Sequence, residues 1–425
     1  MQNLKIRLFI FLLVSATTSI GFAQCPTGDI TISNQNQVNN FPQTYPNCHR
    51  LNAGLFIDGT NVTNLDSLIQ IDTIDATLSI FENLQLVSLA GLKNLKSVQD
   101  FSISGSPLLT SLKGLDSLKT ATNSLVIGQM NGLESLEGIQ AEYVRQFAIL
   151  QCNKLTSLQG LDKLGRVSTF AITQNKNLVS FNGVNPRLTF GDHFTINSNP
   201  KLVELANFEN FDFVYNLDIR NNLVLNNLNG LRNLKRTFYF SLVNNPALEN
   251  LDILTNLNTI ELEMTIAKNA KLKSIEGLAN VDAGLLDSIS IIDNVTLSMC
   301  SMKSVCDFLN LDMGKYSISN NAVGCNDKVS ILAQCNTTSS FFEKSNDVTF
   351  YPNPATDFVY FKGLKGIRKL GIYHISGILI QSVEVKGDEL VLPVDHLVSG
   401  IYFLKPTDPQ ISPSKVMKLF VSQLK

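Results

Sequence analysis

The sequence predicts a mainly β protein, in which a right-handed parallel β-solenoid with disulfide caps is followed by a small antiparallel β-sandwich. Three observations lead to this prediction. Similar stretches recur at a nearly constant step, asparagines recur once per step, and the pattern changes near residue 348 to short alternating strands. A constant step of this size is typical of stacked coils. The 425 residues carry a net charge of −2, so no basic field indicates nucleic acid as a partner.

The first 23 residues form a predicted signal peptide. Lys5 and Arg7 precede a short apolar run, and small residues precede the cleavage site. The run is too short to span a membrane, so we expect no transmembrane segment after cleavage. Lipidation of Cys25 is an alternative, but Gln24 stands where a lipobox requires a small residue.

Residues 24–50 form a predicted N-terminal cap. The terminal coil of a solenoid exposes an apolar face unless a cap covers it. Disulfides are common in exported proteins, and we expect a bond between Cys25 and Cys48 in this cap.

Residues 51–298 form the predicted solenoid. Within it, aligned stretches begin at Thr77, Asp100, Ser124, Gln146, Thr169, His193, Asn216, Tyr239, Glu263 and Ser288, with steps of 22 to 25 residues. Each stretch alternates apolar with small or polar residues, which predicts a half-buried strand. A polar corner and an apolar return with leucines every third residue complete each coil.

A column of asparagines marks the polar corner. A buried amide satisfies both the N–H and the C=O groups that a corner leaves facing inward. The column contains Asn83, Cys152, Asn175, Asn199, Asn222, Asn245, Asn269 and Asn294. We therefore expect Cys152 to be a buried ladder residue. A reactive thiol is the alternative, and it would require a basic or histidine neighbour.

This pattern resembles leucine-rich repeats, and more closely their receptor L-domain variant. The motif is a strand followed by N-x-x-L and L-x-G-L-x-x-L, as in "NAKLKSIEGLANV" (Asn269–Val281). The resemblance covers Leu51–Asn321 and implies a right-handed parallel β-solenoid. Standard leucine-rich repeats have N-x-L in place of N-x-x-L, and this chain departs from them there.

Residues 299–335 form a predicted C-terminal cap. We expect short helices within Cys300–Asn310 and Cys325–Cys335, with one further strand between them. Of the three ways to pair the four cysteines, we favour Cys300–Cys325 with Cys306–Cys335. A zinc site is the alternative, although the spacing lacks a C-x₂-C knuckle.

A polar linker at residues 336–347 leads to residues 348–425, where short strands alternate with turns. This pattern predicts the antiparallel sandwich. Pro352 and Pro354 fix φ and are expected to set the turn at its entry. Thr356 and Asp357 are expected to bond to free N–H groups of that turn.

The last module resembles the C-terminal sorting domain of the type IX secretion system of Bacteroidota. The resemblance is carried by Tyr351–Phe361, Leu370–Ile380, Leu397–Lys405 and Lys415–Phe420. The motif residues are Tyr351, Pro352, Asn353, Pro354, Thr356, Asp357, Gly377, Gly400 and Tyr402. His374 stands where the family usually has Asp or Asn. The resemblance implies contact with the type IX secretion machinery and delivery through the periplasm to the outer cell surface or the medium. An ordinary binding sandwich is the alternative.

The body contains no H-E-x-x-H, G-x-S-x-G or G-x-x-x-x-G-K-[ST] motif. We expect no enzymatic activity, cofactor or metal, and predict a binding or adhesion scaffold for an extracellular protein or glycan. The candidate binding face contains Phe81, His193, Asp218, Arg220 and Tyr239. Asp218 and Arg220 can also be interpreted as a solvated pair on one strand. The alternative function is a solenoid-based extracellular hydrolase or lyase that acts on polysaccharide.

Overall fold

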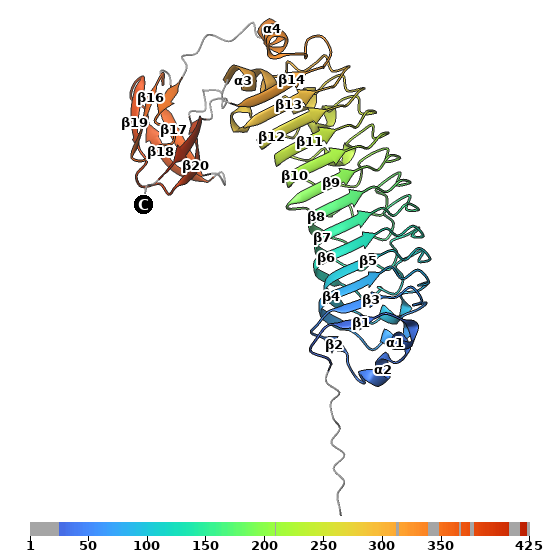
Figure 1. Ribbon diagram of the computed structural model, residues 1–425. Coiled ribbons are helices and arrows are strands. Elements are labelled where there is room, and N and C mark those ends of the chain that lie inside the picture. The colour runs from blue at the N-terminus through green and yellow to red at the C-terminus, as the bar shows by residue number, and fades with distance from the viewer. Residues whose placement is uncertain are drawn as a thin grey trace, which may run out of the picture.

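The computed structural model describes residues 25–208, 210–311, 314–338, 348–364, 367–374, 378–407 and 417–422. The predicted signal peptide and most of the predicted linker lie outside these residues. The described chain is mainly β, with one 14-stranded sheet, a few short helices and two small sheets near the C-terminus. Figure 1 shows the large sheet as a curved stack of strands in chain order. We call residues 25–338 the array and residues 348–422 the tail module.

Every pair of strands in the large sheet is parallel, in the order β1-β3-β4 and onward to β14, with β2 beside β4. The strands are β1 (Ile30–Ile32), β2 (Arg50–Leu51), β3 (Leu55–Asp58), β4 (Thr73–Phe81), β5 (Ser97–Ser104), β6 (Thr120–Gly128), β7 (Tyr143–Leu150), β8 (Arg166–Thr173), β9 (His193–Asn197), β10 (Phe213–Arg220), β11 (Arg236–Val243), β12 (Thr259–Ala267), β13 (Ser288–Ile292) and β14 (Lys315–Ser319).

The register of this sheet reproduces the alignment of the repeats. Thr77 pairs with Asp100, Asp100 with Ser124, and the series continues without a slip to Glu263 with Ser288. One step in the sequence is therefore one coil of the array. The structure also places β1, from within the predicted N-terminal cap, in the same sheet.

One hydrophobic core runs through the array. Alternate strand residues point inward and meet the leucines of the apolar returns. Phe147, Phe170 and Phe194 occupy the same position in neighbouring coils, and their ring centroids lie 5.6 and 5.8 Å apart. Each coil thus buries the apolar side of the next, as stacked repeats require.

Short helices lie in the returns. Longer ones lie at both ends of the array, where Figure 1 labels α1 and α2 at one end and α3 and α4 at the other. The helices are η1 (Asp66–Leu68), η2 (Ala90–Leu92), η3 (Asn229–Leu231), η4 (Asp252–Leu254), η5 (Glu276–Leu278), η6 (Ala283–Leu285), α1 (Gln35–Asn39), α2 (Phe41–Thr44), α3 (Lys303–Leu311) and α4 (Lys328–Thr338). Helix α4 extends to Thr338, past residue 336, where the linker was predicted to begin.

Disulfides close both ends of the array. They join Cys25 to Cys48, Cys300 to Cys325, and Cys306 to Cys335, which are the pairs favoured from the sequence. Because all four C-terminal cysteines are in disulfides, the alternative of a zinc site at these cysteines is wrong.

The asparagine column forms a hydrogen-bonded ladder in the buried corner. In Asn222, for example, Oδ1 accepts from the backbone N–H of Asn199 at 3.1 Å, and Nδ2 donates to the carbonyl oxygen of Ile196 at 3.0 Å. The same arrangement repeats from Asn175 to Asn294. All eight predicted ladder residues are buried.

Cys152 replaces an asparagine within this ladder. Its backbone N–H donates to Oδ1 of Asn175 at 2.9 Å. Its Sγ lies 3.6 Å from the carbonyl oxygen of Leu150 and 3.8 Å from that of Ile127, which are the positions that an asparagine Nδ2 contacts in other coils. Burial raises the pKa of the Cys152 thiol to about 12. A protonated thiol here imitates the donor of an amide.

The tail module contains two antiparallel sheets that share one core. One sheet has the order β15-β16-β19 and the other has β18-β17-β20-β21. The strands are β15 (Thr349–Tyr351), β16 (Phe358–Lys362), β17 (Lys369–His374), β18 (Leu379–Glu384), β19 (Glu389–Pro393), β20 (Gly400–Pro406) and β21 (Met417–Val421). Figure 1 shows the module beside the end of the array that carries β12 to β14.

Candidate functional site

Aromatic side chains gather on the outer face of the large sheet, near the start of β10 and β11. The ring of Tyr215 stacks on Phe238 at a centroid distance of 4.7 Å and meets the edge of Tyr239 at 5.7 Å. Phe213 lies 6.4 Å from Phe238. Tyr215 is 38% exposed, so this cluster contacts solvent. We call Phe213, Tyr215, Arg236, Phe238 and Tyr239 the aromatic patch.

An irregularity that recurs along the sheet places two successive side chains of β11 on its outer face. Strand β11 buries Thr237 and Phe240, so both residues between them, Phe238 and Tyr239, face outward. The pairing of β11 with β12 shifts register between Thr237 and Tyr239. A strand that bends in this way presents two successive side chains on one face instead of alternating them.

Arg236 adds a fixed positive charge to the patch. Its guanidinium carbon lies 5.1 Å from the ring centroid of Phe238 and 5.7 Å from that of Phe213. Its Nε donates to Oε1 of Glu261 at 2.6 Å, so the side chain is held in place. Burial raises the pKa of the Glu261 carboxyl, and the Arg236 guanidinium opposes this rise. Partial burial raises the pKa of the Tyr239 hydroxyl, and the neighbouring Tyr215 adds to this rise.

The structure brings together two of the five predicted face residues. His193 lies on β9 with its ring 6.3 Å from Tyr215, and Tyr239 contacts the same Tyr215 from β11. Asp218 and Arg220 form an ion pair with an Nε–Oδ1 distance of 2.6 Å, further along β10.

Phe81 does not join the aromatic patch. It is 43% exposed, but it lies on β4, five strands away from β9 in the sheet order. At about 4.8 Å per strand, this is a separation of roughly 24 Å.

The sequence reasoning missed Phe213, Tyr215, Arg236 and Phe238. The aligned stretches begin at Asn216 and Tyr239, whereas the strands begin earlier, at Phe213 and Arg236. The aromatic residues just before the aligned stretches were the available signal.

The motif of the tail module is built around Asn353. Its Nδ2 donates to the carbonyl oxygen of Lys418 at 3.0 Å, and its Oδ1 accepts from the N–H of Phe420 at 2.7 Å. The side chain thus pairs with β21 as a neighbouring strand would. Pro352 and Pro354 flank Asn353, just after the end of β15, and both follow cis peptide bonds.

The other motif residues lie close to the two sheets. Thr356 donates to Oδ2 of Asp357 at 3.2 Å, and Tyr351 ends β15. Tyr402 is buried in β20, which begins at Gly400, and its hydroxyl donates to the carbonyl oxygen of Val398 at 2.8 Å. Gly377 lies outside the described residues.

An ion pair joins the tail module to the array. Lys418 of β21 lies with its Nζ 2.7 Å from Oδ1 of Asp287, which immediately precedes β13. The same lysine contributes to the electrostatic environment of Glu261, beside Arg236 of the aromatic patch.

The described residues contain no group of three or more His, Cys, Asp or Glu side chains that could hold a metal ion. Within the same residues, no helix has the length and apolar character needed to cross a membrane.

A family model described as a secretion system C-terminal sorting domain matches residues 349–421. A comparison with curated proteins found no match to this chain. The matched residues coincide with the tail module, so the predicted sorting domain is confirmed. This domain supports export through the type IX secretion system and implies contact with its machinery. It also implies secretion or attachment at the outer surface.

Proposed function

We propose that this chain is an exported binding protein, and that the array is a non-enzymatic recognition module of the leucine-rich-repeat or receptor L-domain type. The match of the tail module to a sorting domain supports localisation at the outer surface or in the medium. The aromatic patch is the observation that supports the binding function. We propose that an extracellular protein binds to this patch.

The composition of the patch differs from that of neighbouring coils. Tyr215 and Phe238 occupy a position where the preceding coils have polar residues, namely Arg145, Ser168 and Asp192. The coils with polar residues here form the same sheet, so stacking does not require an aromatic ring at this position. Exposed tyrosine, phenylalanine and arginine side chains dominate the energetics of protein interfaces.

The test is a screen of the full chain against extracellular-protein arrays. The same screen is run with the double variant Tyr215→Ser, Tyr239→Ser and with the control Phe81→Ser, which removes an exposed aromatic ring from a distant coil. We expect a protein hit that the double variant loses and the control keeps. Both variants should retain the wild-type melting temperature, because the altered side chains lie on the surface.

Two results would count against the proposal. The absence of any protein hit for the full chain would remove the assigned partner. Turnover of a polysaccharide, measured as release of new reducing ends, would favour the hydrolase or lyase function instead.

A further inference from the structure

A groove of about 1030 Å³ runs along the polar corner of the array, from the coil of β4 to the coil of β10. Its walls are the residues directly before and directly after the buried ladder position of each coil. They are Glu82, Leu84, Gly105, Pro107, Gln129, Asn131, Gln151, Asn153, Gln174, Lys176, Ser198, Pro200, Asn221 and Leu223. Seven stacked coils at about 4.8 Å per strand give a length of roughly 29 Å between the first and the last.

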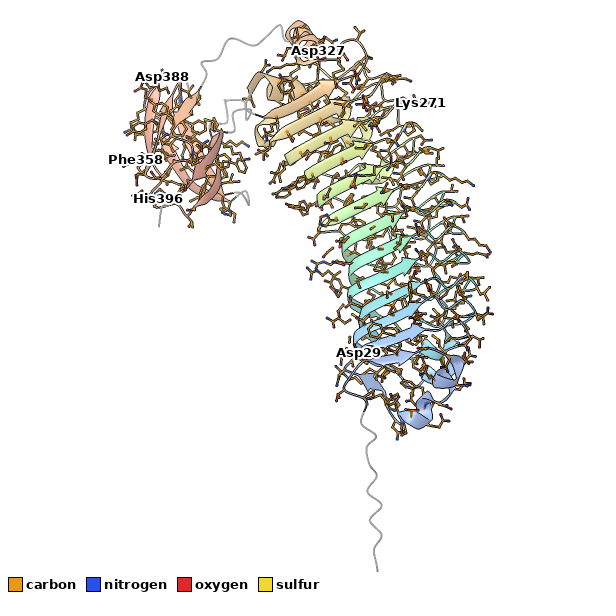
Figure 2. All side chains as sticks on the ribbon, in the orientation of Figure 1. Asp29, Lys271, Asp327, Phe358, Asp388 and His396 are labelled. Carbon is orange, nitrogen blue, oxygen red and sulfur yellow. A yellow bond between two sulfur atoms is a disulfide. The ribbon has the colours of Figure 1, made fainter. Side chains whose placement is uncertain are left out.

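The corner lies on the side of the array toward which the strands point. Lys271, which is labelled in Figure 2, projects from this side two coils beyond the end of the groove. The aromatic patch lies near the opposite ends of the strands, so the two surfaces are separate.

The middle of the groove is a neutral surface of amides. Gln151 donates to Oε1 of Gln174 at 2.8 Å, and Asn153 donates to Oδ1 of Asn131 at 2.8 Å. An amide has two donor hydrogens and two acceptor lone pairs, and each of these bonds uses one of them. The backbone N–H of Lys176 also donates to Oδ1 of Asn153 at 3.4 Å. These four amides line the groove and keep further donor and acceptor capacity beyond these bonds. Among the described lining residues, Glu82 and Lys176 are the charged ones, and none is aromatic.

The backbone at the wall residues favours other side chains than glutamine. Gln129, Gln151 and Gln174 have φ angles of 51°, 55° and 58°. This left-handed region favours glycine and asparagine. In the other coils of the groove the same corner position holds Gly105 and Asn221, and also Glu82 and Ser198. The backbone conformation therefore does not explain why glutamine occupies this position in three successive coils. The same position is left-handed in coils beyond the groove as well, for example at Lys268 and Asp293, so the conformation belongs to the repeat. What distinguishes the middle of the groove is that the long amides of Gln129, Gln151 and Gln174 line it.

The backbone of this wall is already paired. The N–H groups of Gln129, Gln151 and Gln174 donate to carbonyl oxygens of the next coil at 2.9, 3.1 and 2.9 Å. A peptide that binds by adding a strand needs free backbone groups, and these N–H groups are used. A ligand must instead bond to the side-chain amides. Sugar hydroxyls both donate and accept, as amides do.

We propose that this groove binds a neutral glycan chain, laid along the axis of the array across several coils. A charged polymer would require a row of charges of the opposite sign, and the described lining residues supply one base and one acid. The proposal concerns a second surface, and it does not rest on the partner proposed for the aromatic patch.

The experiment is calorimetric titration of the full chain with neutral hexasaccharides of glucose, xylose and mannose, and with the corresponding disaccharides. We expect at least one hexasaccharide to bind, and its disaccharide to bind at least tenfold more weakly because it spans fewer coils.

The variant Gln129→Gly, Gln151→Gly, Gln174→Gly should weaken that binding at least tenfold and remain folded, since glycine suits the observed φ angles. The matched control Asn320→Gly changes an amide at the same corner position, with φ of 55°, four coils beyond the groove. It should bind as the wild type does. If the triple variant does not fold, Asn131→Ala, Asn153→Ala removes amides from the opposite wall and should give the same loss.

Three results would overturn the inference: no binding of any neutral hexasaccharide, binding that survives both sets of groove variants, or binding restricted to charged oligosaccharides. Because the aromatic patch is tested with a protein partner, the two proposals fail independently. A chain that keeps its protein partner but binds no glycan refutes the groove alone.

Discussion

Cys152 shows how a single residue acts within the array. Its Sγ lies where an amide nitrogen lies in other coils, and burial raises its pKa to about 12. The thiol is therefore protonated at pH 8, and a thiolate is needed for reaction with alkylating reagents. We predict that Cys152 reacts with iodoacetamide only as fast as the array unfolds. Labelling at the rate of a free thiol peptide would contradict this.

The same residue gives a prediction for stability at alkaline pH. In the unfolded chain the thiol ionises near its ordinary value of 9.0, whereas in the folded chain it holds its proton to about 12. The unfolded state therefore loses this proton first, and the free energy of unfolding falls as pH rises from about 9 to 12. Denaturant titrations at several pH values should show this fall in the free energy of unfolding in the wild type, and it should be absent in Cys152→Asn. An equal slope in both proteins would contradict it.

Asn222 provides a prediction for the ladder itself. Replacement by alanine leaves the N–H of Asn199 and the carbonyl oxygen of Ile196 without this partner, both in the buried corner. We expect a loss of about 2–4 kcal/mol in the free energy of unfolding. The exposed Asn226→Ala should change it by less than about 0.5 kcal/mol. Equal losses in chemical denaturation would show that the ladder is not specifically stabilising.

At the scale of elements, the turn in each return depends on close contact between coils. Gly138 has a φ of 111°, and a Cβ there would lie 2.1 Å from the carbonyl oxygen of Leu112. We expect Gly138→Ala to cost about 2 kcal/mol or more, because both the φ angle and the contact oppose a side chain. The melting temperature of Gly165→Ala should equal or slightly exceed that of the wild type, since the nearest atom to a Cβ there is 3.5 Å away. Similar melting temperatures for Gly138→Ala and Gly165→Ala would show that the close approach at Gly138 does not limit stability.

The strands could be predicted because the same sequence pattern recurs in each coil. Each coil must bury one face of its strand and pair the backbone groups of its corner. One alternating stretch and one corner amide therefore recur at the same step. The alignment therefore placed Thr77 beside Asp100 and Glu263 beside Ser288, as the register shows. The cap disulfides followed because export favours them and few cysteines are present.

The aromatic patch could not be predicted in full, because most of its residues lie just before the stretches that the repeat aligns. The bend between Thr237 and Phe240 turns two successive residues outward, and a period of two cannot show which residues will do so. The alignment therefore included Tyr239 and omitted Tyr215 and Phe238. The groove was missed for a related reason, since its walls come from pairs of residues spread over seven coils.

At the scale of the whole molecule, the sorting domain and the proposed recognition surfaces lie in separate parts of the chain. The tail module has its own core and carries the match to the sorting domain. The array has one continuous core between disulfide-bonded ends. Described contacts between the two parts include the ion pair of Lys418 with Asp287, near the residues that hold Arg236.

The most direct test of the proposed binding function is a comparison of binding isotherms for the protein partner found in the screen. Wild type, Tyr215→Ser and Phe81→Ser are compared at one salt concentration. We predict that Tyr215→Ser weakens binding at least tenfold, about 1.4 kcal/mol, since Tyr215 contacts both Phe238 and Tyr239. Phe81→Ser should match the wild type. Equal affinity of Tyr215→Ser and wild type would contradict binding through the aromatic patch.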